Sequence, residues 1–127
     1  MTIVDNIDIS HLLKARDVFG RLEAHASTEQ GKMALIKAFE YSYELSWKTM
    51  KRALESQGIL AGSPKETFRK AVQIGLIENP EVCFKFLEAQ NLTVHTYIEE
   101  CLDDILGKIK NFLQELDKLI TRLKALK

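Results

Sequence analysis

Apolar residues recur every three or four positions along most of this 127-residue chain, which is the spacing of a helix with one buried face. The clearest stretch runs from about Thr28 to Gln57, where a stripe of large apolar residues lies beside a stripe of small ones. The large residues are Met33, Ile36, Phe39, Tyr43, Trp47, Met50 and Leu54, and the small ones are Ala38, Ser42, Ser46, Thr49 and Ala53. A helix covered on two sides is predicted to lie at the centre of a bundle, and Gly58 is predicted to end it.

The N-terminal segment, residues 1–9, is predicted to be an irregular lead-in whose Ile and Val side chains pack against the body or a partner. Ser10 is a suitable N-cap, because its hydroxyl can accept a hydrogen bond from a backbone N–H in the first helical turn. A helix is therefore predicted to begin here, and it is expected to fade between Ala26 and Glu29.

Two short helices are predicted between the central helix and the last one. Residues 63–66 (Ser-Pro-Lys-Glu) have the pattern of a capping box with proline at the first helical position, and Gly75 is expected to end the helix that they open. Residues 79–81 (Asn-Pro-Glu) repeat the start signal. The two helices are expected to form a structured crossover to the C-terminal part of the chain.

The last helix is predicted to run from about Thr93 to Ala125, with apolar residues at alternating steps of four and three and a further apolar row beside them. The main set is Ile98, Leu102, Ile105, Ile109, Phe112, Leu116, Leu119 and Leu123, and the further row is Leu106, Leu113 and Ile120. This width suits a helix that faces a bundle core. Since no strand pattern is present, the predicted fold is all-α, an up-and-down four-helix bundle with short additional helices in one domain.

Charge and cysteine content narrow the class of protein. Lys and Arg together number 18, as do Asp and Glu, so no global charge draws the chain to nucleic acid or to a membrane surface. The chain has no apolar run of about 18 residues to cross a bilayer, and Asp5 and Asp8 interrupt any signal-peptide pattern. Cys83 and Cys101 are predicted to be reduced packing residues, no zinc-ligand spacing is present, and a cytoplasmic location is expected.

Residues 90–97 (Gln-Asn-Leu-Thr-Val-His-Thr-Tyr) gather the candidate chemistry, because they place an amide, an imidazole and a phenol close together. Thr93 is predicted to cap the N-terminus of the last helix. His95 and Tyr97 would then lie in its first turn, where backbone N–H groups and the positive helix end favour an anion such as phosphate. A histidine at this place can also be an ordinary capping or core-edge residue.

Four segments match one known family in the same order along the chain. They are residues 39–51 (Phe-Glu-Tyr-Ser-Tyr-Glu-Leu-Ser-Trp-Lys-Thr-Met-Lys), 63–66 (Ser-Pro-Lys-Glu), 75–77 (Gly-Leu-Ile) and 91–97 (Asn-Leu-Thr-Val-His-Thr-Tyr). Together they resemble the nucleotidyltransferase substrate-binding proteins, which belong to the HEPN superfamily of helical bundles. The resemblance extends from about Phe19 to the C-terminus and implies that residues 1–127 form one HEPN-like domain.

The resemblance implies a homodimer that pairs with a small, separately encoded nucleotidyltransferase, often as a toxin–antitoxin module. That partner would hold the nucleotide and magnesium, so this chain is expected to need no cofactor of its own. HEPN toxins of this kind cleave RNA without metal, through an arginine and a histidine that follows it after four to six residues and meets it across the dimer. In a related subgroup, the tyrosine two residues after the histidine accepts AMP from the nucleotidyltransferase. The resemblance assigns these roles to His95 and Tyr97, and Asn91 matches the polar residue after the arginine.

Gln90 occupies the position of the signature arginine. Cleavage without metal needs a base for the 2′-hydroxyl proton, which His95 can supply near neutral pH, and a group that stabilises charge growing on the phosphate. A guanidinium is a fixed cationic fork, whereas an amide offers two neutral N–H donors. Because loss of one such donor typically costs about 10²–10³ in rate, efficient cleavage ranks below a binding role unless Lys48 or Lys51 reaches the cleft.

Two interpretations stay open, beside a dimer with only a scaffolding role. The first is a non-catalytic substrate-binding or target subunit of a two-component nucleotidyltransferase, with a cleft lined by polar residues. Those residues are Gln90, Asn91, Thr93, His95, Tyr97, Glu44 and Lys48. The second is a metal-independent ribonuclease with RNA as substrate and His95 as base, attenuated by Gln90. The plainer alternative makes Glu44 and Lys48 a solvated surface pair and leaves Tyr97 packed at a rim.

Overall fold

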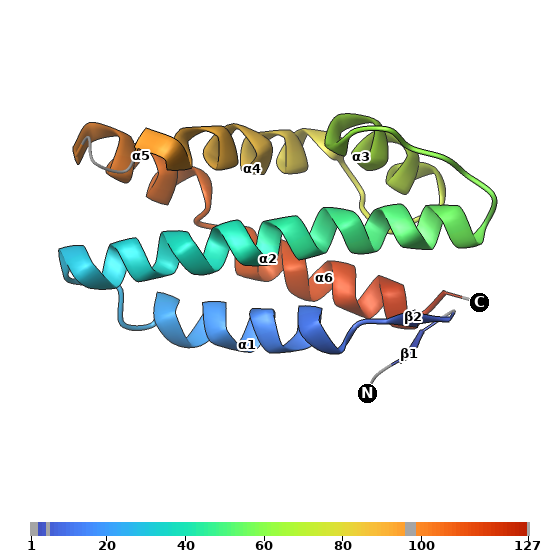
Figure 1. Ribbon diagram of the computed structural model, residues 1–127, viewed down its shortest axis with the longest axis horizontal. Coiled ribbons are helices and arrows are strands. Elements are labelled where there is room, and N and C mark those ends of the chain that lie inside the picture. The colour runs from blue at the N-terminus through green and yellow to red at the C-terminus, as the bar shows by residue number, and fades with distance from the viewer. Residues whose placement is uncertain (1–2, 5, 96–98, 127) are drawn as a thin grey trace.

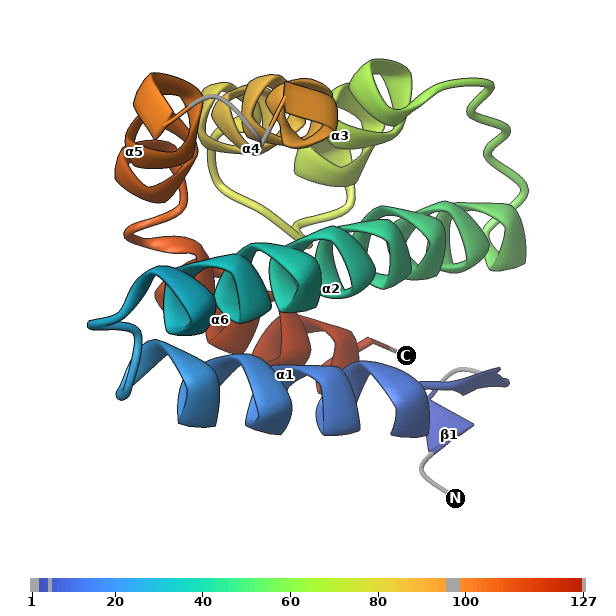
Figure 2. The same ribbon diagram turned by 60° about the vertical axis from the view of Figure 1, so that its left-hand side comes forward.

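The computed structural model describes residues 3–4, 6–95 and 99–126 of the chain and confirms the predicted all-α bundle. Its elements are β1 (Ile3–Val4), β2 (Ile7–Asp8), α1 (Ser10–Glu23), α2 (Glu29–Ser56), α3 (Pro64–Gln73), α4 (Pro80–Leu92), the 3₁₀ turn η1 (Thr93–His95), α5 (Glu99–Lys108) and α6 (Phe112–Lys124). The long helix α2 lies in the middle (Figures 1 and 2). α1 and α6 lie on one side of it, and α3, α4 and α5 lie on the other.

The central helix has the predicted bounds and the predicted small-residue stripe. The Thr28 hydroxyl accepts the N–H of Gly31, and Gly58 follows the helix with φ 77°, in the left-handed region that favours glycine. Ser42 and Ser46 are buried. The Ser42 hydroxyl donates to the backbone carbonyl of Ala15 in α1, and the Ser46 hydroxyl donates to the backbone carbonyl of Ser42. These bonds satisfy the buried hydroxyls, so α1 can approach α2 closely along this stripe.

The N-terminal lead-in differs from the prediction in two respects. β1 and β2 pair as a short antiparallel ladder, with Asn6 between them at φ 66°. Ser10 is the first residue of α1 and not its cap; the Asp8 carboxylate accepts both its N–H (2.9 Å) and its hydroxyl (2.6 Å). A carboxylate two residues upstream thus takes the role expected of the serine hydroxyl, and these two hydrogen bonds lower the pKa of Asp8.

The two short helices begin and end as predicted. The Ser63 hydroxyl accepts the N–H of Glu66 (3.2 Å), and the Asn79 side-chain oxygen accepts the N–H of Glu81 (2.9 Å). The Glu66 carboxylate reaches the N–H of Gly62, one residue before the cap. Gly75 follows α3 with φ 80°. These caps are formed by residues a few positions apart, which is why the sequence alone indicated them.

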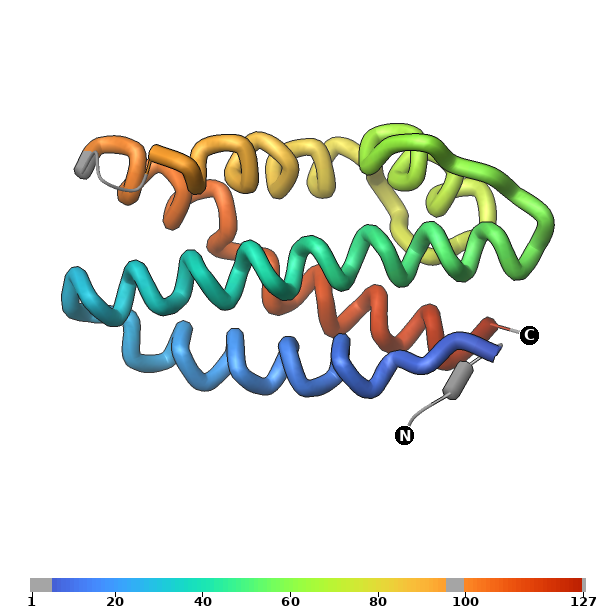
Figure 3. The backbone as a smooth tube through the Cα atoms, viewed as in Figure 1, coloured from blue at the N-terminus to red at the C-terminus, as the bar shows by residue number. Residues whose placement is uncertain are grey.

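The prediction of one continuous last helix is wrong, because this part of the chain forms two helices. α5 ends at Lys108 and α6 begins at Phe112. Figures 1 and 3 show the chain leaving α5 beside α4 and entering α6 beside α1, in the other layer. Ile105, Ile109 and Phe112 are all buried, so the apolar spacing continues across the break. A periodic pattern reports which residues are buried and does not reveal that the helix axis changes.

Four phenylalanines from four helices meet at the centre of the core. The ring of Phe112 in α6 lies 5.0 Å from that of Phe39 in α2, 5.1 Å from that of Phe19 in α1 and 5.1 Å from that of Phe86 in α4, measured between ring centres. All three contacts are edge-to-face, the arrangement that places a positive ring edge against a negative ring face. Phe112 therefore joins both layers of the bundle.

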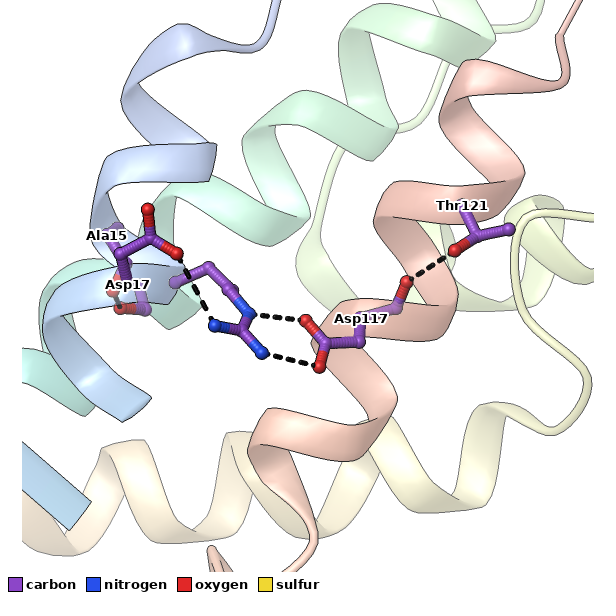
Figure 4. A network of polar contacts seen from close by, with 6 residues as sticks. Ala15, Asp17, Asp117 and Thr121 are labelled. Carbon is purple, nitrogen blue, oxygen red and sulfur yellow. Dashed lines mark hydrogen bonds and ion pairs between the residues drawn. The ribbon is translucent and has the colours of Figure 1, made fainter. Parts of the chain in front are cut away.

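A polar contact at the surface also holds α6 against α1 (Figure 4). The Arg16 guanidinium donates two hydrogen bonds to the Asp117 carboxylate, at 2.6 and 2.9 Å, and a third nitrogen faces Asp17 at 3.4 Å. The Thr121 hydroxyl donates to the backbone carbonyl of Asp117. The paired carboxylate raises the pKa of Arg16. Since both partners are partly exposed, the pair orients the helices more than it stabilises them.

Phe112→Ala is expected to lower the free energy of unfolding by about 3–5 kcal/mol, because it removes the ring shared by three aromatic contacts. Urea unfolding followed by circular dichroism measures this change. Leu60→Ala is the control, since Leu60 is 75% exposed and its loss should change stability by no more than about 0.5 kcal/mol. A cost below about 1 kcal/mol for Phe112→Ala would contradict the central role of this cluster.

Two glycines offer a matched test of the helix ends. Gly75→Ala is expected to destabilise the protein by about 1–2 kcal/mol, because φ 80° is strained for a residue with a Cβ atom. Gly107 lies within α5, and a Cβ atom there would meet nothing within 4 Å. Gly107→Ala should therefore stabilise the protein by about 0.5 kcal/mol through helix propensity. Thermal unfolding of both variants checks the pair, and shifts of the same sign would contradict it.

Candidate functional site

The stretch that carries the candidate chemistry lies at the end of α4, where the chain turns toward α5 (Figure 3). Gln90 and Asn91 belong to the last turn of α4, and His95 closes the 3₁₀ turn η1. Gln90 is half-buried, Thr93 is buried, and Asn91 and His95 are exposed. Tyr97 lies outside the described residues, so its role as a candidate AMP acceptor stays a prediction.

Thr93 does not cap the N-terminus of a helix, and this prediction is wrong. Its backbone has helical angles (φ −64°, ψ −20°), and its hydroxyl donates to the carbonyl of Gln90 at 2.7 Å. The residue therefore closes the C-terminal end of α4. This end of a helix carries the negative end of the dipole, which attracts cations and not phosphate. The α-helix N-terminus on which the expected anion site relied is therefore not at Thr93, and the next described α-helix begins at Glu99.

Gln90 projects from the face of α4 that also carries Phe86, one helical turn earlier. Phe86 is a core residue, and the side-chain oxygen of Gln90 is buried without a hydrogen-bond partner among the described residues. Position 90, where the resemblance expects an arginine, therefore holds a neutral amide that is partly enclosed by the bundle. Such a group can donate hydrogen bonds to a phosphate oxygen but brings no positive charge.

Glu44 and Lys48 form an ion pair on α2, with 3.0 Å between the Lys48 nitrogen and a Glu44 oxygen. The other Glu44 oxygen accepts the indole N–H of Trp47 at 3.1 Å. Both charged side chains are substantially exposed, so within one chain they form a solvent-exposed ion pair.

One chain alone does not bring this pair to the end of α4. α2 and α4 run in opposite directions (Figures 1 and 3), and Phe39 packs on Phe86 with 6.4 Å between ring centres. Gln90 lies four residues beyond Phe86, and Lys48 lies nine residues beyond Phe39 in the opposite direction. Thirteen residues at the helical rise correspond to roughly 20 Å along the bundle. A cleft shared by Gln90, Glu44 and Lys48 would thus have to form between two chains.

The structure also shows a groove that the sequence did not indicate. Lys85 and Glu88 of α4 face Gly107 and Lys108 at the end of α5, with Asn111 beyond them, around a space of about 410 Å³. The Lys108 nitrogen lies 3.8 Å from Glu88 and 3.4 Å from Asp104. Each of these residues looks like an ordinary surface residue in the sequence, because only the turn between α4 and α5 brings them together.

The described residues contain neither a cluster that could hold a metal ion nor a helix that could span a membrane. Within residues 3–4, 6–95 and 99–126, no three His, Cys, Asp or Glu side chains gather closely enough to hold a metal ion. No helix of this part of the chain is long and apolar enough to cross a membrane. Cys83 is buried and Cys101 half-buried, and both are free thiols. Burial raises the pKa of Cys83 to about 12, so this thiol is a packing group and not a nucleophile.

Comparisons with known proteins agree with this architecture. Residues 9–125 match the family described as nucleotidyltransferase substrate binding protein like. A protein of Haemophilus influenzae described as "Probable ribonuclease HepT" is 34% identical over 94 residues, a match that covers 70% of this chain and 64% of that protein. A crystal structure of a protein from Thermus thermophilus superposes with a TM-score of 0.75 at 28% identity, over 87% of this chain and 98% of the other. This chain therefore belongs to the nucleotidyltransferase substrate-binding family.

Proposed function

We propose that this protein is a metal-independent ribonuclease of the toxin type, restrained by a separately encoded nucleotidyltransferase and weakened by Gln90. The observation that supports this most is the exposed His95 at the family's signature position, in a chain of this family. The relative described as a probable ribonuclease points in the same direction.

His95 would act as the general base. It removes the proton of a ribose 2′-hydroxyl, whose oxygen attacks the adjacent phosphorus while the bond from phosphorus to the 5′-oxygen breaks. The products are a 2′,3′-cyclic phosphate and a 5′-hydroxyl, which takes a proton. Negative charge grows on the phosphate oxygens during this step. The side-chain N–H groups of Gln90 can donate to these oxygens, but a neutral amide stabilises them less than a guanidinium does.

A second function, that of a non-catalytic target or substrate-binding subunit, is favoured by the same Gln90. A chain that has lost the cationic half of the signature can still form a dimer and present a polar cleft with the exposed Asn91 and His95. The nucleotidyltransferase partner would then hold the nucleotide and magnesium and perform the transfer. Tyr97 is the proposed acceptor for AMP in either case.

The ribonuclease proposal is tested by incubating the purified protein with single-stranded RNA in the presence of EDTA. Slow cleavage is expected for the wild type, none for His95→Ala, and cleavage faster by about 10²-fold for Gln90→Arg, because the cation returns to the phosphate. His25→Ala is the control, since His25 is an exposed histidine outside the signature. If folded Gln90→Arg protein leaves every RNA intact, the ribonuclease proposal is wrong.

The partner proposal is tested by co-expressing the chain with a small nucleotidyltransferase from the same genome and measuring intact masses and peptide maps. We expect one AMP on the peptide that contains Tyr97 and none on the Tyr97→Phe variant. Tyr41→Phe is the control, because Tyr41 is an exposed tyrosine on α2 and its loss should leave the modification unchanged. A stable complex without AMP would support the non-catalytic subunit. Neither complex nor modification would contradict both partner roles.

A further inference from the structure

Tyr43 carries a polar group that the proposed function does not use. Only 3% of this residue is exposed, and its ring packs among Phe39 and Phe68 of the core. Its hydroxyl is buried and has no hydrogen-bond partner among the residues that the structure describes. Buried hydroxyls nearly always have a partner, either a protein group or an ordered water molecule. The Tyr43 hydroxyl therefore needs a partner other than the described protein groups.

A small cavity lies next to Tyr43, where α2 meets α4 and α6. Its volume is about 30 Å³, which suits a single water molecule. Apolar residues form much of its wall. Ser46, Asn79, Cys83 and Glu115 line it as well.

Three of these side chains retain hydrogen-bonding capacity. The Ser46 hydroxyl donates to the Ser42 carbonyl, so its oxygen can still accept. Asn79 uses its side-chain oxygen to cap α4, which leaves its NH₂ group as a donor. One Glu115 oxygen faces Lys118 at 3.5 Å, which leaves the other oxygen as an acceptor. A water molecule here would thus find the two or more polar partners that a buried water needs.

Two groups that line the cavity, Tyr43 and Cys83, have raised pKa values. Burial raises the pKa of Tyr43, and the neighbouring Cys83 adds to this shift. Burial likewise raises the pKa of Cys83 to about 12. Both groups are therefore neutral at physiological pH, and Tyr43 presents an O–H donor and not a phenolate.

We propose that this cavity is a binding site for one ordered water molecule, which accepts the hydrogen bond of Tyr43 and donates to the Glu115 carboxylate. The water joins α2 to α6. It also lies beside Asn79, the cap of α4, and so ties the start of α4 to α2 and α6.

The test is a crystal structure of the full chain at about 1.5 Å, with Tyr43→Phe as the variant. The wild type is expected to show one density peak about 2.5–3.0 Å from the Tyr43 oxygen. Tyr43→Phe removes only that oxygen, so the peak should be lost or displaced while the ring stays in place. Tyr41→Phe is the matched control, since Tyr41 lies on the same helix, is 57% exposed and should leave the peak unchanged.

The wild-type crystals alone decide the proposal if the variant does not fold. A clear map without a peak beside Tyr43 overturns it, as does a direct hydrogen bond from Tyr43 to Glu115. Xenon bound at this place under pressure also overturns it, because xenon occupies dry apolar cavities and not hydrated polar ones.

Discussion

The contact of Phe112 with three other rings is the constraint on which the rest of the structure depends. It joins α6 to α1, α2 and α4 at one point, so the two layers of the bundle share a single aromatic centre. Phe112 is also the first residue of α6. The chain must leave α5, which packs beside α4, and turn before this ring can enter the core between the layers. The break at residues 109–111 is the backbone consequence of that requirement.

The aromatic cluster around Phe112 also determines which residues at the end of α4 are buried and which are exposed. Phe86 anchors the inner face of α4, and Gln90 follows on that face one turn later, which is why its side-chain oxygen is buried. Thr93 continues inward and binds the Gln90 carbonyl, whereas Asn91 and His95 are exposed. The core therefore holds the backbone of the site and leaves an imidazole accessible at the end of the helix. A site built on such a rigid element is precise in geometry but adjusts little to a ligand.

The fold and most helix ends could be predicted because they depend on neighbours in sequence. Thr28, Ser63 and Asn79 each accept a backbone N–H two or three positions onward, and the glycines at two helix ends have positive φ. The end of α4 could not be predicted, because a threonine hydroxyl can accept at an N-terminus or donate at a C-terminus, and Thr93 does the second.

Some tertiary features could not be predicted from the sequence, for a different reason. The apolar repeat continues unbroken from Ile105 to Phe112, so it hides the turn between two helices. The Tyr43 cavity and the groove at Lys85 and Lys108 join residues far apart in the chain, and each residue alone fits an ordinary helical pattern. Periodicity predicts that a side chain is buried, whereas its partners depend on the angle and register between helices.

Gln90 limits the chemistry of the candidate site, because it supplies no positive charge for a phosphate. A phosphate beside His95 would find neutral amide donors there, and the negative end of α4 close by. Lys85 and Lys108 lie on the same pair of helices, but Lys108 already faces Glu88 and Asp104. Lys108 is thus already paired with acidic side chains, and Gln90 leaves the site without the signature arginine. Lys48 of α2 lies roughly 20 Å from Gln90 along the bundle, so within one chain it does not replace the missing arginine beside His95.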